Sequence, residues 1–93
     1  MIVGTLQIGL LLHGCQSLKE KRMILNGLKS RIKNKFNVSI AEVDQNEKWQ
    51  RTTIGIATVA NEKKYIQGIF NKILNLINSD VRVELIDQFI DIY

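Results

Sequence analysis

Hydrophobic residues recur at every second position through the first segment of the chain. Between Ile2 and Leu12, most even positions carry isoleucine or leucine, and the odd positions carry mainly small, polar or β-branched residues. This period of two predicts a strand with one buried face. Comparable segments predict three more strands, over Phe36–Asp44, Gln50–Ala60 and Val81–Tyr93. In the last segment the alternation changes phase near Leu85, which indicates a β-bulge.

Two segments between these strands follow the period of an α-helix. Ser17 is a suitable N-cap, and Glu20, three residues later, completes a capping box. The helix is predicted to run to about Lys35. Its apolar residues fall within about 80° of one another on the helical wheel: Leu18, Leu25, Leu28 and Ile32. Asn61 is predicted to cap a second amphipathic helix, which ends before a turn at residues 78–80.

The order of elements is strand, helix, strand, strand, helix, strand. A short polar tip, Gln45–Lys48, separates the two middle strands and favours an antiparallel hairpin. Each strand–helix–strand half requires a right-handed crossover, and both amphipathic helices need a sheet face to cover. The sequence therefore predicts a single α+β domain over residues 1–93, a ferredoxin-like βαββαβ sandwich. Its four-stranded antiparallel sheet is expected to have the order 4-1-3-2, with two helices on one face.

The other face of this sheet is predicted to be open and lined by small or neutral side chains. The two central strands place six residues on it: Thr5, Gln7, Gly9, Thr53, Gly55 and Ala57. None is aromatic, which argues against base stacking of the kind that RNA-recognition motifs use. Such a face suits packing against another sheet, so a homodimer through the open sheet face is predicted. The acids on the two edge strands are interpreted as protection against edge-to-edge pairing: Glu42, Asp44, Glu84, Asp87 and Asp91.

Composition is that of one small globular domain. The 93 residues are 45% hydrophobic and 24% charged, values typical of folded chains, and there is no proline to mark a linker. The one cysteine, Cys15, allows no internal disulfide, which suits a reducing compartment. No apolar run approaches the ~18 residues of a membrane span, and the first residues lack the features of a signal peptide. We therefore expect a cytoplasmic protein without membrane contact.

Positive charge is concentrated in the first predicted helix. Residues 17–35 contain seven lysines and arginines against one acid, whereas the rest of the chain contains six cations and eight acids. The whole formal charge of +4 therefore comes from this segment, which indicates an anionic partner. Four cations fall within about 80° on the helical wheel, beside the apolar residues: Lys19, Arg22, Lys29 and Lys33. Such a stripe is suited to follow a phosphate backbone.

Two interpretations of this basic helix are open. A run of charge is often a solvated face that keeps a small protein soluble. Against this, acids at i,i+4 spacing do not balance the cations, and several cations lie in the first turns, where the helix dipole disfavours positive charge. We favour a phosphate-binding site. Its candidate nucleic-acid-binding residues are Lys19, Lys21, Arg22, Lys29, Lys33 and Arg51.

Trp49 lies next to Gln50 and Arg51 at the end of the predicted hairpin. An exposed tryptophan at this place is suited to stack on a base or to contact a partner. Alternatively, the ring packs over the rim of the sheet and its indole N–H bonds a carbonyl. We favour the packed arrangement, and Trp49 stays a candidate aromatic contact.

His13 and Cys15 are the single histidine and the single cysteine of the chain. A zinc site would need further ligands from acids or from a second subunit, and a catalytic thiol would need a base and an orienting group. The residues around Gly14 also lack the spacing of a P-loop. We therefore interpret His13 and Cys15 as structural, and we expect no metal, no cofactor and no catalytic residues.

Four stretches carry a resemblance to a known family: Met1–Gly4, Ser17–Arg22, Phe36–Asp44 and Trp49–Arg51. In this order and spacing the chain resembles, over essentially its whole length, the YlxP family of small bacterial proteins of unknown function. The resemblance implies a ferredoxin-like fold. In some bacteria it also implies a gene neighbourhood shared with translation and ribosome-maturation factors, which points to ribosomal RNA or a ribosomal particle as partner.

Two functions from different classes follow from these observations. The first is a non-enzymatic RNA- or ribosome-associated binding module that uses the basic first helix. The second is a protein-interaction or small-ligand regulatory domain that assembles through the open sheet face. We favour the first, because the concentration of charge in one helix is the most specific feature of the sequence.

Overall fold

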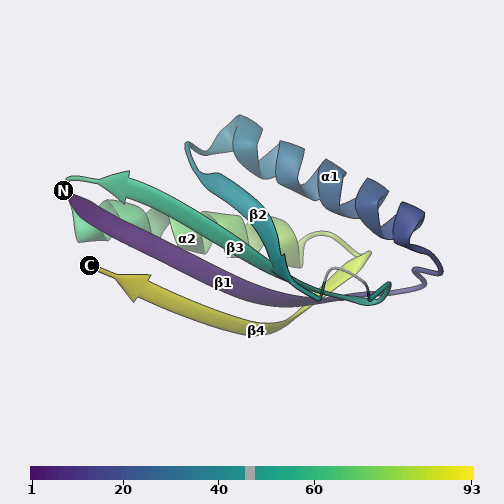
Figure 1. Cartoon of the computed structure of the whole chain (residues 1–93). Coiled ribbons are helices and arrows are strands. Elements are labelled where there is room, and N and C mark those ends of the chain that lie inside the picture. The colour runs from purple at the N-terminus through teal and green to yellow at the C-terminus, as the bar shows by residue number, and fades with distance from the viewer. Residues whose placement is uncertain (46–47) are drawn as a thin grey trace.

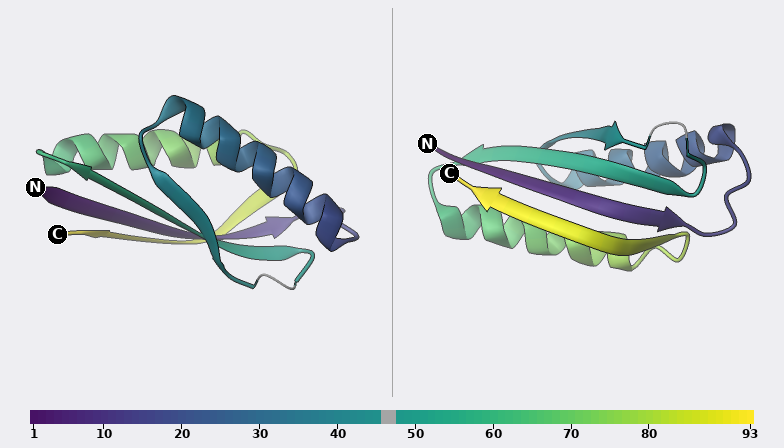
Figure 2. Two further views of the ribbon diagram at one scale, coloured as in Figure 1. Left: turned by 45° about the horizontal axis from the view of Figure 1, so that its top comes forward. Right: turned by 60° about the horizontal axis from the view of Figure 1, so that its bottom comes forward.

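The computed structural model describes residues 1–45 and 48–93 as a two-layer sandwich (Figure 1). The elements follow the predicted order: β1 (Ile2–Leu12), α1 (Leu18–Lys35), β2 (Ser39–Asp44), β3 (Arg51–Ala60), α2 (Lys63–Asn78) and β4 (Val83–Ile92). The strands form one antiparallel sheet of order β2-β3-β1-β4, which is the predicted order read from the other edge. Both helices lie on one side of this sheet (Figure 2). The predicted ferredoxin-like fold is confirmed.

The hydrophobic core lies between the sheet and the two helices. The even positions of β1 supply its centre, where Leu6, Ile8 and Leu10 are fully buried. The helix α2 packs across them with six buried residues: Ile66, Ile69, Phe70, Ile73, Leu74 and Ile77. A Cβ atom on Gly4 would overlap with Cγ2 of Ile66, so a glycine is required where Ile66 of α2 packs against β1. Among the described residues, no helix has the length and apolar character to cross a membrane.

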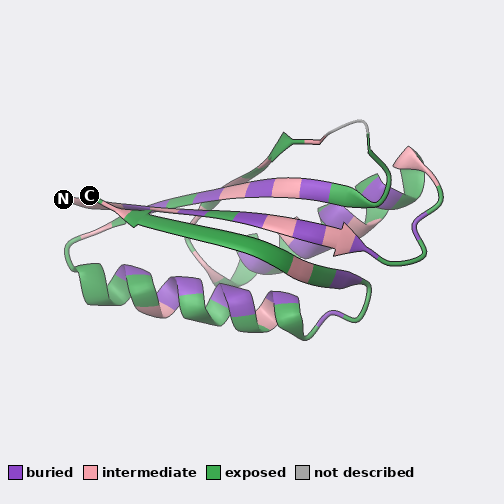
Figure 3. Cartoon of the chain, turned by 90° about the horizontal axis from the view of Figure 1, so that it is seen from below, coloured by how far each residue is buried: buried purple, intermediate pink, exposed green. Residues whose placement is uncertain are grey.

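Buried and less buried residues alternate along β1 and β3, as the sequence pattern predicts (Figure 3). The edge strand β4 differs, because most of it is exposed. Gly9 on β1 pairs with Asp87, but the next residue, Leu10, pairs with Leu85. Ile86 is therefore an extra residue in β4, which confirms the bulge predicted near Leu85. C-terminal to this bulge, the odd-numbered residues of β4 lie on the open face of the sheet.

Several element boundaries differ from their predictions. β3 begins at Arg51 rather than at Gln50, and β4 covers Val83–Ile92 rather than Val81–Tyr93. β2 begins at Ser39 rather than at Phe36, because Phe36 is the C-cap of α1 and its N–H donates to the Ile32 carbonyl at 2.9 Å. The N-cap of α2 is Glu62 and not Asn61, and no side-chain hydrogen bond caps this helix. The predicted polar tip between β2 and β3 includes residues 46 and 47, which lie outside the described residues.

Candidate nucleic-acid interface

The helix α1 begins at a side-chain cap. Ser17 has an extended backbone, and its hydroxyl oxygen accepts a hydrogen bond from the N–H of Glu20 at 3.1 Å. This confirms Ser17 as the N-cap. The Glu20 carboxylate accepts a hydrogen bond from the N–H of Gln16 at 2.8 Å, one residue further back than in a regular capping box. Glu20 therefore fixes the turn that leads from β1 into the basic helix.

Four of the predicted phosphate-binding residues lie on the outer side of α1, and we call them the basic stripe: Lys19, Arg22, Lys29 and Lys33. Three of them are exposed and Lys29 is partly exposed. None of the four forms an ion pair with any residue that the structure describes. At 1.5 Å per residue, the stripe extends over about 21 Å of helix. Its positive charge is therefore free to contact an extended polyanion.

Lys21 does not belong to this surface, which corrects its assignment as a phosphate-binding residue. Its side chain is only 2% exposed, and its Nζ lies 2.7 Å from Oε2 of Glu42 on β2. Nζ also donates a hydrogen bond to the carbonyl oxygen of Gln45 at 2.7 Å. The same Glu42 oxygen accepts a hydrogen bond from the hydroxyl of Thr52 on β3. A buried charge requires partners that replace its hydration. Because the partners of Lys21 lie on the β2–β3 hairpin, this buried set of polar groups joins α1 to the hairpin.

Glu42 consequently has a different role from the edge protection that was expected of it. Its carboxylate is 18% exposed and closes the ion pair with Lys21 on the helix side of the sheet. Asp44, the other acid of β2, is exposed and accepts a hydrogen bond from the N–H of Gln45 at 2.7 Å. Gln45 has a φ of 60°, a left-handed conformation that is uncommon outside glycine. Asp44 therefore supports the backbone turn that brings the Gln45 carbonyl to Lys21.

The opposite flank of α1 is tied to the start of β4. Arg31 forms an ion pair with Asp80, whose side chain is 4% exposed. Arg82 donates two hydrogen bonds to the same carboxylate, from Nε at 3.1 Å and from Nη2 at 2.8 Å. The hydrogen bonds from Arg82, together with that from Arg31, hold the pKa of Asp80 well below its ordinary value despite its burial. Arg31 thus contributes to the fold and is not part of the basic stripe.

The strand β3 begins with Arg51, two residues after Trp49, and its first residues lie at the same end of the molecule as the start of α1 (Figure 2). The backbone of Gln50 between them accepts a hydrogen bond from the N–H of Leu12 at 2.8 Å, which fixes this segment beside the end of β1. Trp49 is 50% exposed, so much of its ring is open to a partner and the fully packed arrangement is not observed. Arg51 is exposed and alternates with the buried Thr52, which places it on the open face of the sheet. The structure therefore separates Arg51 from the basic stripe by the thickness of the sheet.

His13 and Cys15 have separate surroundings. Nε2 of His13 lies 2.9 Å from Oε1 of Glu84 on β4, and both side chains are about half exposed. Cys15 is buried, and its Sγ donates to the carbonyl oxygen of Ser17 at 3.4 Å. Within residues 1–45 and 48–93, no group of three or more His, Cys, Asp or Glu side chains is placed to hold a metal ion. The packing of Cys15 agrees with its interpretation as a structural residue.

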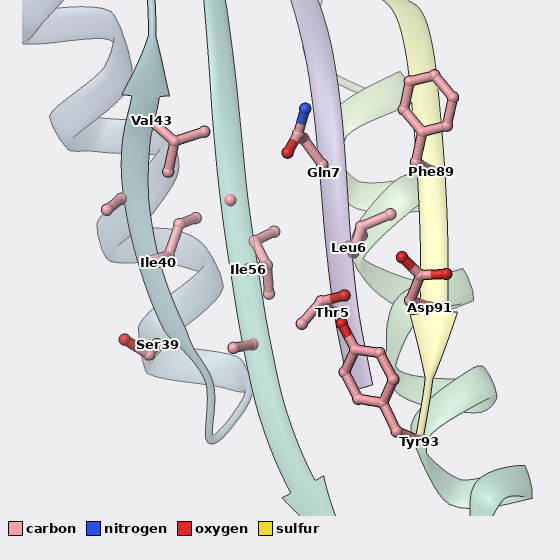
Figure 4. Close-up of a pocket in the computed structure, with 13 residues that line it drawn as sticks. Thr5, Leu6, Gln7, Ser39, Ile40, Val43, Ile56, Phe89, Asp91 and Tyr93 are labelled. Carbon is pink, nitrogen blue, oxygen red and sulfur yellow. The ribbon is translucent and has the colours of Figure 1, made fainter. Parts of the chain in front are cut away.

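A shallow hollow of about 610 Å³ on the open face is a second candidate site (Figure 4). Its floor includes four of the residues predicted on this face: Thr5, Gln7, Gly55 and Ala57. Sequence reasoning missed its walls, which are formed by Phe89 on β4, by Tyr93 directly after β4 and by Val43 on β2. The sequence did contain a signal for the two aromatic residues. The bulge predicted near Leu85 places the odd-numbered residues that follow it on the open face of the sheet.

Comparison with known proteins assigns the chain to a family. Residues 3–89 match the family described as "Protein of unknown function (DUF503)". The chain is also 35% identical over 83 residues to the "Uncharacterized protein YlxP" of Bacillus subtilis (strain 168), a match that covers 89% of this chain and 90% of that protein. Both matches agree with the resemblance carried by the four sequence stretches. The chain therefore belongs to the YlxP-like family of proteins of unknown function.

Proposed function

We propose that the protein is a non-enzymatic RNA-binding module that associates with the ribosome in the cytoplasm through the basic stripe of α1. One observation carries this proposal. The four cations of the stripe have no acidic partner among the described residues, whereas Lys21 and Arg31 of the same helix are both paired. The cations that form ion pairs within the fold are thus different residues from the unpaired cations of the basic stripe. Unpaired charge on a rigid helix is what a phosphate-binding surface requires.

The physical basis of this binding is the release of counterions. Each lysine or arginine that contacts a phosphate displaces a condensed cation, so the affinity falls as the salt concentration rises. The log–log slope is about 0.7 per contact on single-stranded nucleic acid. A stripe of four cations therefore supports a salt-sensitive, sequence-tolerant interaction. A preference for certain RNA sequences would require contacts to the bases. The half-exposed Trp49, at the end of the molecule where α1 starts, provides an aromatic side chain for such a contact.

The decisive experiment replaces three residues of the stripe, Arg22, Lys29 and Lys33, by glutamate. We expect this triple variant to lose co-sedimentation with ribosomal subunits at low salt and to keep the circular dichroism of the parent. Replacing the same three residues by glutamine should weaken binding less and should flatten the salt dependence by about 0.7 in log–log slope per lost contact.

The matched control is a second triple variant on α2, in which Lys63, Lys64 and Lys72 are replaced by glutamate. These three lysines are exposed, and their replacement changes the net charge of the chain by the same amount. The control should still bind ribosomal subunits. Equal losses from both triple variants would contradict the proposal, because they would show only a non-specific attraction between a cationic protein and a polyanion.

A further inference from the structure

The open face of the sheet carries several large exposed apolar side chains, which we call the apolar strip. Four large side chains on it are more than half exposed: Val43 at 53%, Val59 at 58%, Phe89 at 64% and Tyr93 at 70%. Val59 pairs with Val3, whose backbone exchanges hydrogen bonds with that of Tyr93, so these three residues are neighbours at the end where the termini lie. Large exposed apolar side chains that gather on one face of a protein often mark a contact surface.

This face is shaped as a ridge beside a hollow. Phe89 lies on the edge strand β4 and Tyr93 directly follows it, and the hollow lies between these two residues and Val43 on β2 (Figure 4). The floor is low because β3 carries Gly55 and Ala57 at its centre. A Cβ atom on Gly55 would lie 2.9 Å from Cγ1 of Val43, so the glycine allows Val43 to lie across β3.

We propose that this face binds a second copy of the chain, sheet against sheet, with the aromatic ridge of each copy in the hollow of the other. A two-fold axis between the sheets makes the contact isologous, so one face supplies both the ridge and the hollow that the partner needs. Because the helices cover the opposite side of the sheet, no element has to move for the two faces to meet.

The area of the face agrees with what a stable dimer requires. Four strands about 4.8 Å apart, most of them about ten residues long at about 3.3 Å per residue, cover roughly 600 Å² per copy. The two copies together would bury about 1,200 Å², which is at the lower limit of the range for specific interfaces. Aromatic side chains that fill a pocket are the usual main contributors to such contacts.

The charges on the face favour a second copy over an RNA. Asp87 and Asp91 lie on the open side of the edge strand β4 and would repel phosphate groups. Arg51 lies on the same face at the hairpin end. In a two-fold pair each copy brings both aspartates and one Arg51, so opposite charges are available across the interface. Asp87 lies on the edge strand near the solvated rim, where interface charges are tolerated. Asp91 lines the hollow between Phe89 and Tyr93, so in the dimer it requires a cationic partner such as Arg51 of the second copy.

The test is the mass of the protein in solution, measured by analytical ultracentrifugation over a concentration series. The parent should sediment as a dimer, and Phe89→Arg should raise the dissociation constant of the dimer by about 100-fold or more. The matched control is Tyr65→Arg, which introduces the same charge at a 60% exposed aromatic residue on α2, in the helix layer. The control should remain a dimer, and both variants should keep the circular dichroism of the parent.

A second variant keeps the proposal testable if Phe89→Arg does not fold. Ala57→Arg places a charge on the exposed floor of the hollow and should also give monomers. Gly55→Arg is unsuitable, because any side chain there meets Val43. A parent that stays monomeric at its highest soluble concentration would overturn the proposal, as would a Phe89→Arg protein that remains a dimer. Neither result bears on the basic stripe, which lies in the other layer.

Discussion

The ammonium group of Lys21 is buried between α1 and the β2–β3 hairpin, where Glu42 and the Gln45 carbonyl replace its hydration. Removing one partner of a buried ion pair leaves the other charge uncompensated, which costs about 3–5 kcal/mol. We therefore expect Lys21→Met to lower the free energy of unfolding by about 3–5 kcal/mol in urea denaturation.

Lys19→Met is the matched control, because it makes the same chemical change at an exposed position on the same helix. Its effect on stability should be within about 0.5 kcal/mol. A double variant, Lys21→Met with Glu42→Leu, should regain part of the loss, since an apolar pair leaves no unpaired charge. Equal stability of Lys21→Met and Lys19→Met would show that the buried ion pair contributes nothing in solution.

The burial of Lys21 can be predicted from the helical wheel. At about 100° per residue, Lys21 lies about 160° away from Lys19 on the wheel and between Leu25 and Leu28, inside the apolar seam. The position was therefore predictable as buried, although the lysine was assigned to the surface by its charge. Its partner was harder to predict, because only the packing of α1 against β2 brings Glu42 within 2.7 Å of Nζ.

At the scale of the elements, Asp80 connects α1 to the loop before β4 through Arg31 and Arg82. The pKa of Asp80 is lowered by these partners, so its contribution to stability is complete above the ordinary aspartate pKa of 3.8. The contribution is lost as the pH falls below about 4 toward the lowered pKa. The difference in unfolding free energy between the parent and Asp80→Asn should therefore be constant from pH 7 to about 5 and should shrink below pH 4.

Urea denaturation of both proteins between pH 3 and pH 7 provides this measurement. We expect the difference to reach about 1–2 kcal/mol at neutral pH, because the two arginine partners are half exposed and solvent screens them. Glu62→Gln is the control, as this carboxylate is exposed, lies outside the open face and makes no side-chain cap hydrogen bond. A difference between the parent and Asp80→Asn that did not change with pH would exclude a contribution from the lowered pKa.

The six elements were predictable because each shows a clear period in the sequence, although most residues of the edge strands β2 and β4 are exposed. The boundaries at Phe36 and Asn61 were not, since the end of α1 and the start of α2 depend on backbone hydrogen bonds that no side chain signals. The ridge of Phe89 and Tyr93 followed from the predicted bulge. It was missed because only the two central strands were considered for the open face.

At the scale of the whole molecule, the two layers differ in their surface chemistry. The helix layer carries the basic stripe, whereas the open sheet face carries the apolar strip with Asp87 and Asp91. The concentration of positive charge in one segment was visible in the sequence. The gathering of apolar side chains and acids on the opposite side was not, because it depends on the order of the strands and on the bulge in β4.

A dimer formed through the open faces would present two basic stripes, one on each outer side of the particle. If both proposals hold, a long RNA contacts both stripes, and the second contact is strengthened by the high effective concentration that the first creates. On a long ribosomal RNA fragment, the monomeric Phe89→Arg protein should therefore bind about 100-fold more weakly than Tyr65→Arg, which has the same net charge. On an oligonucleotide too short to reach both stripes, the two variants should bind equally in fluorescence anisotropy. Equal affinities of the two variants for the long RNA would mean that each dimer uses one stripe at a time. Unequal affinities of the two variants for the short oligonucleotide would place part of the RNA contact on the sheet face itself.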